Sequence, residues 1–205
     1  MATLNTTNAH ESTRRRVLSA AVETILEEGF YRASSNRIAD RAGVSWGVIQ
    51  YHFGSREQLL LAVAEAGSSR LLEAVRTAEI HGNTVGERLD SLADVIWEHY
   101  RRPEFLAHLQ VMLNLAKDPN TSAGTVRALA ETERTIGGLW QRLLDQVVPT
   151  EHQNPELGGV IFQLIRGLAI GENLIEALPH TISPRVGDEP REMLVRALTL
   201  LVDSL

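Results

Sequence analysis

The side chains that could do chemistry gather between residues 35 and 60, in the run SNRIADRAGVSWGVIQYHFGSREQLL. Residues 46–52 of this run carry aromatic, amide and imidazole groups and no carboxylate: Trp46, Gly47, Val48, Gln50, Tyr51 and His52. A helix face of this composition repels no phosphate and offers hydrogen-bonding groups to the edges of bases. The pattern therefore favours a surface that enters the major groove of a nucleic acid duplex.

Two short helices must position these side chains. The spacing predicts one helix over Ser35–Ala42 and another that begins after Ser45 and ends near His52. Between them, Gly43 can adopt the positive φ that a tight turn requires. The apolar positions predict a small core that closes against a preceding helix: Ile38, Ala39, Ala42, Val44, Ile49 and Phe53.

The rest of the chain has helical periodicity and no sustained alternation with period two, so we expect an all-α fold of nine helices. A first helix is predicted from about Ser12 to Glu28, and a fourth begins at Ser55, where Gln58 completes a capping-box pattern. The other five are expected over about 84–102, 104–117, 125–148, 156–178 and 191–204, with proline-bounded loops at 149–155 and 179–190.

Charge is distributed unevenly along the chain. Residues 1–56 carry seven arginines and five acids, a net charge of +2, whereas the whole chain carries −6 and residues 57–205 therefore −8. A basic head on an acidic body is typical of a protein that meets phosphate at one end, although chance variation of surface charge is the alternative.

Composition excludes several classes of protein. The chain has no cysteine, so it has no disulfide framework and no thiolate chemistry. No apolar run reaches the roughly 18–20 residues of a membrane span, and the first residues lack the pattern of a signal peptide. We therefore expect a cytoplasmic protein that does not bind membranes.

The stretch described above resembles the DNA-binding signature of the TetR family of helix-turn-helix transcriptional regulators. The residues that carry the resemblance are Ile38-Ala39, Ala42-Gly43-Val44-Ser45, Gly47, Tyr51-His52-Phe53-Gly54-Ser55-Arg56-Glu57 and Leu59-Leu60. The nine-helix layout extends it to the whole chain. The resemblance implies a DNA-binding domain over residues 1–56, with a flexible arm at 1–11, and a helical ligand-binding and dimerisation domain over 57–205. A helical hairpin packed for stability alone is the alternative.

The resemblance also implies which residues meet DNA. These are Ser35, Asn36, Ser45, Trp46, Gly47, Val48, Gln50, Tyr51, His52 and Arg56. Ser35 would hold a phosphate at the start of its helix, and Tyr51 and His52 the flanking phosphates. Arg56 stands where the family usually has lysine, again towards phosphate.

Two positions depart from the family pattern. Gln50 occupies a position where tyrosine is usual, so we expect it to read an adenine edge. Trp46 replaces a small or polar residue, and either stacks on a sugar or contacts a thymine methyl, or is partly buried against the turn. The run Arg14–Arg16 is either a clamping arm or a solvated helix start.

The last two predicted helices carry apolar stripes that a two-fold partner could complete into a four-helix bundle. The expected interface residues are Ile161, Leu164, Ile165, Leu168, Gly171, Ile175, Leu194, Leu198 and Leu201. Part of each stripe also belongs to the core of a single chain. The resemblance to the family favours a homodimer.

A sensor pocket for a small, largely apolar molecule is expected in the helical body. Its candidate residues are Trp97, Tyr100, Phe105, His108, Met112, Arg134 and Trp140, which are equally compatible with simple core packing. His99 and His108 with nearby glutamates fit no standard spacing of metal ligands, so neither a metal nor a cofactor is expected.

The sequence therefore predicts a DNA-binding transcriptional regulator, most simply a repressor that a small-molecule effector releases from its operator. An enzyme is the first rival, but the chain lacks GxGxxG, Walker, HExxH and GxSxG patterns, and no catalytic residue is assigned. An architectural DNA binder without sequence preference and an activator of the same family are the others.

Overall fold

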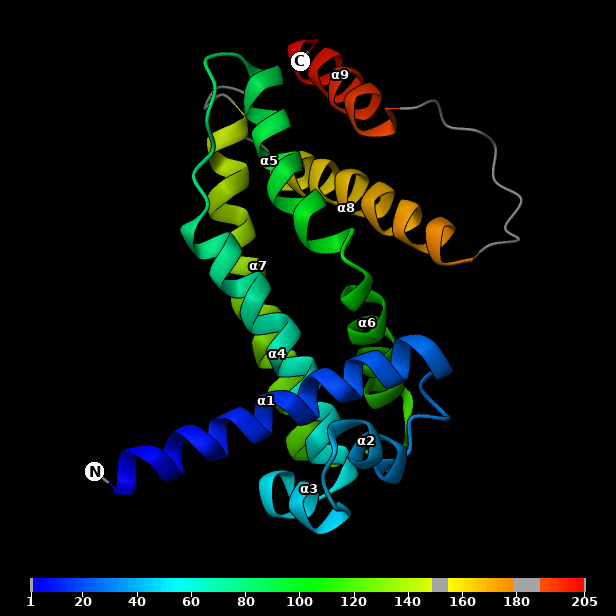
Figure 1. The fold of residues 1–205 in the computed structure, drawn as a ribbon. Coiled ribbons are helices and arrows are strands. Elements are labelled where there is room, and N and C mark those ends of the chain that lie inside the picture. The colour runs from blue at the N-terminus through cyan, green and yellow to red at the C-terminus, as the bar shows by residue number, and fades with distance from the viewer. Residues whose placement is uncertain (1, 149–154, 179–188, 205) are drawn as a thin grey trace. The chain divides into compact units, whose positions relative to one another are not determined.

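The computed structural model describes residues 2–148, 155–178 and 189–204 (Figure 1). Within these residues the chain forms nine α-helices and no strand, which confirms the predicted fold class. The helices are α1 Ala2–Glu28, α2 Ser35–Ala42, α3 Trp46–Phe53, α4 Arg56–Thr77, α5 Val85–Tyr100, α6 Pro103–Lys117, α7 Ala123–Val147, α8 Pro155–Ala177 and α9 Pro190–Asp203.

The first helix differs from its prediction. It begins at Ala2, not near Ser12, so the backbone of residues 2–11 is helical, and the flexibility expected of this arm stays a prediction. Neither glycine nor proline occurs between Ala2 and Glu28, so nothing in this segment interrupts the helix once it has formed. Most of the two predicted proline-bounded loops, residues 149–154 and 179–188, lies outside the described residues.

The chain packs as two compact units, which we call unit 1 and unit 2. Unit 1 consists of Met1–Ser68 and Glu104–Thr132, and unit 2 of Ser69–Pro103 and Glu133–Leu205. The boundaries fall inside α4 and α7, so unit 1 holds α1 to α3, most of α6 and the first parts of α4 and α7. These packing units do not test the predicted division into a DNA-binding domain over residues 1–56 and a helical body over 57–205, which stays a prediction.

The helix pair at α2 and α3 has the caps that its sequence implies. Ser34 precedes α2 with extended backbone, and its hydroxyl accepts a hydrogen bond from the N–H of Arg37. Gly43 ends α2 with φ of 64°, the left-handed conformation that the tight turn requires. The predicted core is confirmed, since Ile38, Ala39, Ala42, Ile49 and Phe53 are buried and Val44 is half-buried against them.

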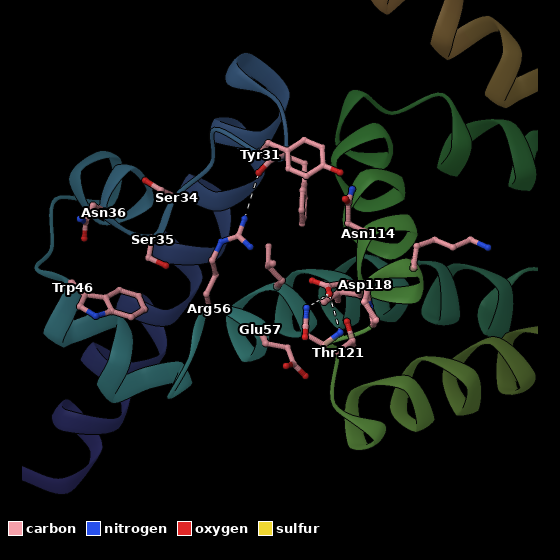
Figure 2. A pocket seen from close by; sticks show the side chains of 16 residues that line it. Tyr31, Ser34, Ser35, Asn36, Trp46, Arg56, Glu57, Asn114, Asp118 and Thr121 are labelled. Carbon is pink, nitrogen blue, oxygen red and sulfur yellow. Dashed lines mark hydrogen bonds between the residues drawn. The ribbon is translucent and has the colours of Figure 1, made fainter.

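The first turn of α4 links three other segments of unit 1. Nη2 of Arg56 donates to the carbonyl oxygens of Phe30 and Ala33 in the α1–α2 loop, at 3.5 and 3.4 Å (Figure 2). Oε1 of Glu57 accepts from Nα and Oγ of Ser122, at 3.1 and 2.7 Å, and from Oγ1 of Thr125, at 2.6 Å. These bonds hold the N-terminus of α7 and the α1–α2 loop on either side of α4.

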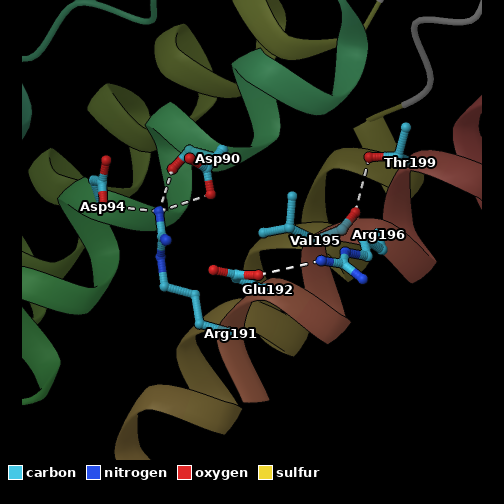
Figure 3. Close-up of polar contacts among 7 residues, drawn as sticks. All are labelled: Asp90, Asp94, Arg191, Glu192, Val195, Arg196 and Thr199. Atoms are coloured by element: carbon cyan, nitrogen blue, oxygen red, sulfur yellow. Dashed lines mark hydrogen bonds and ion pairs between the residues drawn. The ribbon is translucent and has the colours of Figure 1, made fainter. Parts of the chain in front are cut away.

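Polar side chains also join the helices of unit 2. Nη2 of Arg191, at the start of α9, lies 2.9 Å from Oδ1 of Asp90 and 2.7 Å from Oδ1 of Asp94, both on α5 (Figure 3). Nδ2 of the buried Asn173 on α8 donates to the carbonyls of Tyr100 and Arg102, at 2.7 and 2.9 Å. Asn173 thereby satisfies carbonyls at the end of α5 that lack partners within the helix.

Gly67 permits a close approach of α4 and α6. A methyl group built on Gly67 would lie 2.3 Å from Nδ1 and 2.8 Å from Cγ of His108. Burial lowers the pKa of His108, and its Nδ1 is buried without a hydrogen-bond partner among the described residues. A hydrogen bond with the backbone of Val63 also fixes the buried imidazole, so the contact requires a residue without a side chain on α4.

We expect Gly67→Ala to destabilise the protein by about 1–2 kcal/mol, because overpacking costs more than the gain in helix propensity. Urea denaturation of the wild type and variant measures the loss. The matched control is Gly138→Ala in α7, where an added methyl group meets nothing within 4 Å. It should leave stability unchanged or raise it by up to about 1 kcal/mol.

The same substitution in a His108→Ala protein tests whether His108 is the side chain that restricts position 67. In a His108→Ala protein the obstacle is gone, so adding Gly67→Ala should raise stability, since alanine is the better helix former. An equal loss in both backgrounds would show that His108 is not what restricts position 67.

Acid should weaken the link between α4 and α7. The hydroxyls of Thr125 and Ser122 and the N–H of Ser122 hold the pKa of Glu57 below its ordinary value. The resulting stabilisation is complete above the pKa of glutamate in the unfolded chain and is lost as pH falls through the folded pKa. We therefore expect Glu57→Gln to lower the urea midpoint at pH 7.

The urea midpoints of the wild type and of Glu57→Gln should become equal as the pH falls below the pKa of Glu57. Urea titrations from pH 7 to pH 3 test this. Glu65→Gln, an exposed position on the same helix, is the control and should not change the profile. A difference that is constant with pH would mean that the Glu57 carboxylate charge contributes nothing.

Candidate nucleic-acid interface

Helix α3 has an inner and an outer face. Ile49 is fully buried and Phe53 nearly so, and they fix the helix on the core of unit 1. On the other face Gly47, Gln50 and Tyr51 are exposed, and the Tyr51 ring is 78% accessible. The structure therefore brings these three predicted DNA contacts together on one surface, where an amide and a phenol can donate to or accept from a ligand.

The start of α3 adds two further groups. Ser45 is the residue before the helix, and its exposed hydroxyl makes no capping bond, so it remains available. Val48 is half-buried, and Trp46 is half-buried and packs against the core of unit 1. Its partial burial favours the second of the two interpretations of Trp46.

The N-terminus of α2 lies near this surface. Asn36 is exposed and Ser35 half-buried, as the first residues of the helix. Free N–H groups at a helix start attract anions. The residue whose hydroxyl caps the helix is Ser34, which the sequence analysis passed over, although a serine just before a helical segment is a usual cap signal.

His52 lies in an environment that disfavours its charged form. Burial is the main cause that lowers its pKa, and the positive groups of His10 and Arg14 lower it further. Its ring centroid is 4.1 Å from that of His10, and His10 also lies edge-on to Tyr51 at 5.8 Å. A neutral His52 could hold a phosphate only through an N–H group, without a charge. His10 was not predicted to belong to this surface, because it was placed in a flexible arm.

Arg56, which was predicted to face a phosphate, has contacts within unit 1, and its contact with DNA stays a prediction. Its side chain is half-buried, contacts the carbonyls of the α1–α2 loop and lies with its guanidinium carbon 5.2 Å from the Phe30 ring centroid. It therefore stabilises the loop before α2 instead of extending from the outer face of α3. The reason is local: Phe30 and Ala33 are buried beside the first turn of α4 and offer the guanidinium both a ring and carbonyl oxygens.

Several other arginines of unit 1 already have partners. Arg37 lies 2.6 Å from Glu28, and Arg41 pairs with Glu23 and Glu27. In the run at 14–16, Arg14 lies over the Phe53 ring, with its guanidinium carbon 5.2 Å from the centroid, whereas Arg15 and Arg16 are exposed. The run is thus divided: its first member packs on α3, and the other two are the ones available to phosphate.

The candidate sensor residues fall in both compact units, and a pocket formed by them stays a prediction. Phe105, His108 and Met112 belong to unit 1, where Phe105 is buried and Met112 packs on the core. Trp97, Tyr100, Arg134 and Trp140 belong to unit 2. There Tyr100 and Trp140 are buried, and the Trp140 ring lies 4.7 Å from that of Phe162 between centroids.

The predicted interface residues divide into core and surface. Ile161, Ile165 and Leu198 are buried within the single chain, so they pack inside unit 2 and are not exposed to a partner. Leu164, Ile175 and Leu201 are 38–45% exposed, and Leu168, Gly171 and Leu194 are half-buried. Other exposed apolar residues of α8 and α9 extend this surface, and the sequence analysis did not name them: Val160, Leu174, Leu178, Met193 and Leu200.

Helix α8 is unusually apolar. Over Glu156–Ala177 it is long and apolar enough to cross a membrane by length and composition, with 28% of the apolar window buried. The same composition suits a helix that packs on its own unit with one face and on another protein with the opposite face.

Within the described residues, no three acidic or histidine side chains gather as ligands for a metal ion.

Comparison with known proteins gives matches in both sequence and fold. The family described as "Bacterial regulatory proteins, tetR family" matches residues 17–63. The HTH-type transcriptional activator FasR of Mycolicibacterium smegmatis is 42% identical over 65 residues, which span 32% of this chain and 30% of FasR. The HTH-type transcriptional repressor NicS of Pseudomonas putida is 27% identical over 139 residues, 62% of this chain and 66% of NicS.

The similarity in fold covers nearly the whole chain. A TetR-family transcriptional regulator from Vibrio parahaemolyticus has a solved structure that is 25% identical, with a TM-score of 0.66, and the match covers 91% of this chain and 96% of that one. The family match coincides with the helix pair and its capped turn, and the similarity in fold adds the remaining helices. The comparisons therefore identify residues 17–63 as a TetR-family helix-turn-helix domain and give the chain the fold of a TetR-family transcriptional regulator.

Proposed function

We propose that this protein regulates transcription by binding operator DNA as a homodimer, and that it is a repressor. The observation that carries the proposal is the outer face of α3, where Gly47, Gln50 and Tyr51 are exposed together beside the free hydroxyl of Ser45. This face has no carboxylate and lies on a helix held by a buried core, as insertion into a major groove requires. Asn36 and Ser35 would hold the adjoining phosphates.

The repressor part of the proposal has weaker support than DNA binding. FasR is an activator and NicS a repressor, so similarity to these two proteins does not choose between the two roles. A protein that binds its operator tightly and has no added activation surface blocks the polymerase by occupancy alone. Repression is therefore the simpler consequence of the DNA-binding surface described above. The proposal assigns no catalytic reaction to the chain.

The exposed apolar face of α8 and α9 supports the homodimer. Leu164, Ile175 and Leu201 lie in this face beside the half-buried Gly171. An apolar surface of this extent marks an interface, and a two-fold partner would present the same surface. Dimerisation would also supply the second α3 that a two-fold operator needs, about one helical turn or 34–36 Å away.

Release by a small-molecule effector completes the proposal. Its support in unit 2 is the indole of Trp140, which is 4% exposed and whose Nε1 is buried without a hydrogen-bond partner among the described residues. A buried donor of this kind is rare and calls for an acceptor, which a bound molecule would provide. Such a ligand would release DNA only if it bound better to a conformation that does not fit the operator.

Gln50→Ala should relax the sequence preference of DNA binding. If Gln50 pairs with an adenine edge, its loss removes about 1–3 kcal/mol of discrimination at that base pair, or about five- to 150-fold in relative affinity. Fluorescence anisotropy with the duplex upstream of the protein's own gene and with single-base variants of it measures this. Gln141→Ala, an exposed position on α7, is the control.

Two results would contradict this assignment. An unchanged ranking of the duplex variants would exclude Gln50 as a base reader. Equal affinity of the wild type for random and upstream duplex at the same salt concentration would instead indicate an architectural binder and overturn the proposed function.

Leu164→Glu should dissociate the homodimer, since it places a charge in the middle of the apolar face of α8. We expect sedimentation equilibrium to show a dimer for the wild type and a monomer for the variant, with DNA affinity at least tenfold lower. Leu113→Glu makes the same change at a position of α6 that is 53% exposed, and should leave the dimer intact. A Leu164→Glu protein that stays dimeric would place the interface elsewhere.

A further inference from the structure

Unit 1 contains a cavity of about 870 Å³ next to the proposed DNA contacts (Figure 2). Its wall is formed by the α1–α2 loop, the start of α2, the first residues of α3 and α4, the end of α6 and the loop that leads to α7. Known binding sites for small molecules are of this size, roughly 300–1,000 Å³. The cavity lies within one compact unit, so its walls are fixed by the packing described above.

Arg56 supplies a cation to this wall without a matching anion. Its hydrogen bonds to the carbonyl oxygens of Phe30 and Ala33 are long, at 3.5 and 3.4 Å, and both use Nη2. In the described part of the chain no carboxylate forms an ion pair with it. A guanidinium has five N–H donors, so Nε and Nη1 remain for a ligand. Burial lowers the pKa of Arg56, which shows that the charge is partly desolvated and would gain from a negative partner.

The two carboxylates in the wall are directed elsewhere. Oε1 of Glu57 accepts hydrogen bonds from Ser122 and Thr125. Oδ1 of Asp118 accepts from the backbone N–H and the side-chain amide of Asn120, at 2.9 and 3.0 Å. Both groups therefore stabilise the α6–α7 connection. They shape the cavity, whose wall also contains two cations, Arg56 and Lys117, and neither cation forms a recognised ion pair within the described residues.

The remaining wall is rich in groups that bind hydroxyls. Amides and hydroxyls line it from both sides: Asn36, Asn114, Asn120, Ser34, Ser35 and Thr121. Such groups donate to and accept from sugar hydroxyls equally well. The aromatic rings of Tyr31 and Trp46 complete the lining and offer apolar faces to the C–H groups of a sugar.

We propose that this cavity binds a small sugar phosphate, with its phosphate on Arg56 and its hydroxyls on Asn114 and the neighbouring amides. Guanidinium groups recognise phosphate through charge-assisted, often bidentate hydrogen bonds. The amide of Asn114 donates to the carbonyl of Gln110 at 2.8 Å, which leaves its oxygen free to accept from a sugar hydroxyl. Aromatic faces and amides beside the cations Arg56 and Lys117 fit this class of ligand better than an apolar acid.

The ligand would compete with DNA. Ser35, Asn36 and Trp46 line the cavity and are also proposed DNA contacts. A DNA backbone is itself a chain of sugar phosphates, so both ligands present the same chemistry to these residues. This part of the inference rests on the proposed function, whereas binding of the small molecule does not.

Calorimetric titration with glucose 6-phosphate tests the site, with glucose and inorganic phosphate as separate controls at equal ionic strength. We expect one molecule bound per chain, at least tenfold more tightly than either control. Asn114→Ala should raise the Kd of glucose 6-phosphate about tenfold, the effect of losing one hydrogen bond. Asn83→Ala, in an exposed loop of unit 2, should not change it.

A DNA-binding assay then distinguishes the free sugar phosphate from the DNA backbone as the natural occupant. Glucose 6-phosphate should raise the apparent Kd of the wild type for its upstream duplex in proportion to the amount of ligand. In Asn114→Ala this effect should be about tenfold weaker, with duplex affinity itself unchanged, because Asn114 is not among the proposed DNA contacts.

The possible failures are separable. No binding of glucose 6-phosphate beyond that of its two controls, or an unchanged Kd in Asn114→Ala, would overturn the site. Binding of glucose 6-phosphate without displacement of the duplex would overturn the competition with DNA. Arg56 would then have no role in DNA binding beyond its bonds to the α1–α2 loop. A protein that binds no duplex at all would refute the proposed function, while the calorimetric result would still decide on the site.

Discussion

The arrangement of unit 1 depends on two neighbouring charges at the first turn of α4. Arg56 points to one side, into the α1–α2 loop, and Glu57 to the other, onto the N-terminus of α7. Because the two residues are adjacent on a rigid helix, the loop before α2 and the start of α7 are fixed relative to each other. The pose of α2 and α3, and with it the direction of the outer face of α3, follows from this arrangement. Both side chains also line the cavity beside it.

Local sequence signals predicted the helix pair well. The bounds of α2 agree with their prediction, and the caps and the buried set around Ile38 and Ile49 follow from residue type and spacing. Steric preferences and hydrophobic periodicity over a few neighbouring residues determine these bounds, caps and buried positions, so they can be predicted from the sequence. The stripe of α8 was recognised for the same reason, although spacing alone did not separate Ile161 and Ile165, which are buried, from Leu164, which is exposed.

The parts that sequence reasoning missed depend on contacts between distant segments. The role of Arg56 is determined by carbonyl oxygens of residues 30 and 33, and that of Glu57 by residues 122 and 125. No local sequence pattern predicts hydrogen-bond partners that lie so far away along the chain. Similarly, His10 reaches Tyr51 and His52 only because α1 starts at Ala2, and the weakly helical composition of its first residues gave no reason to extend it. The candidate sensor residues were chosen by type, and type alone did not show that they belong to two different units.

The discontinuous build of unit 1 has a consequence for how the chain is made. The core beneath α2 and α3 includes Ala107, Val111, Leu115 and Leu129, so it cannot close when residue 68 leaves the ribosome. Synthesis runs from the N-terminus at roughly 5–20 residues per second, which leaves the apolar faces of α1 and α4 uncovered for several seconds until α6 and the start of α7 emerge. The core that supports α3 is thus completed late in translation, although the residues of α3 are among the first to be made. A ribosome that stalls before residue 129 would hold a nascent chain with an open core, the kind of substrate on which chaperones act.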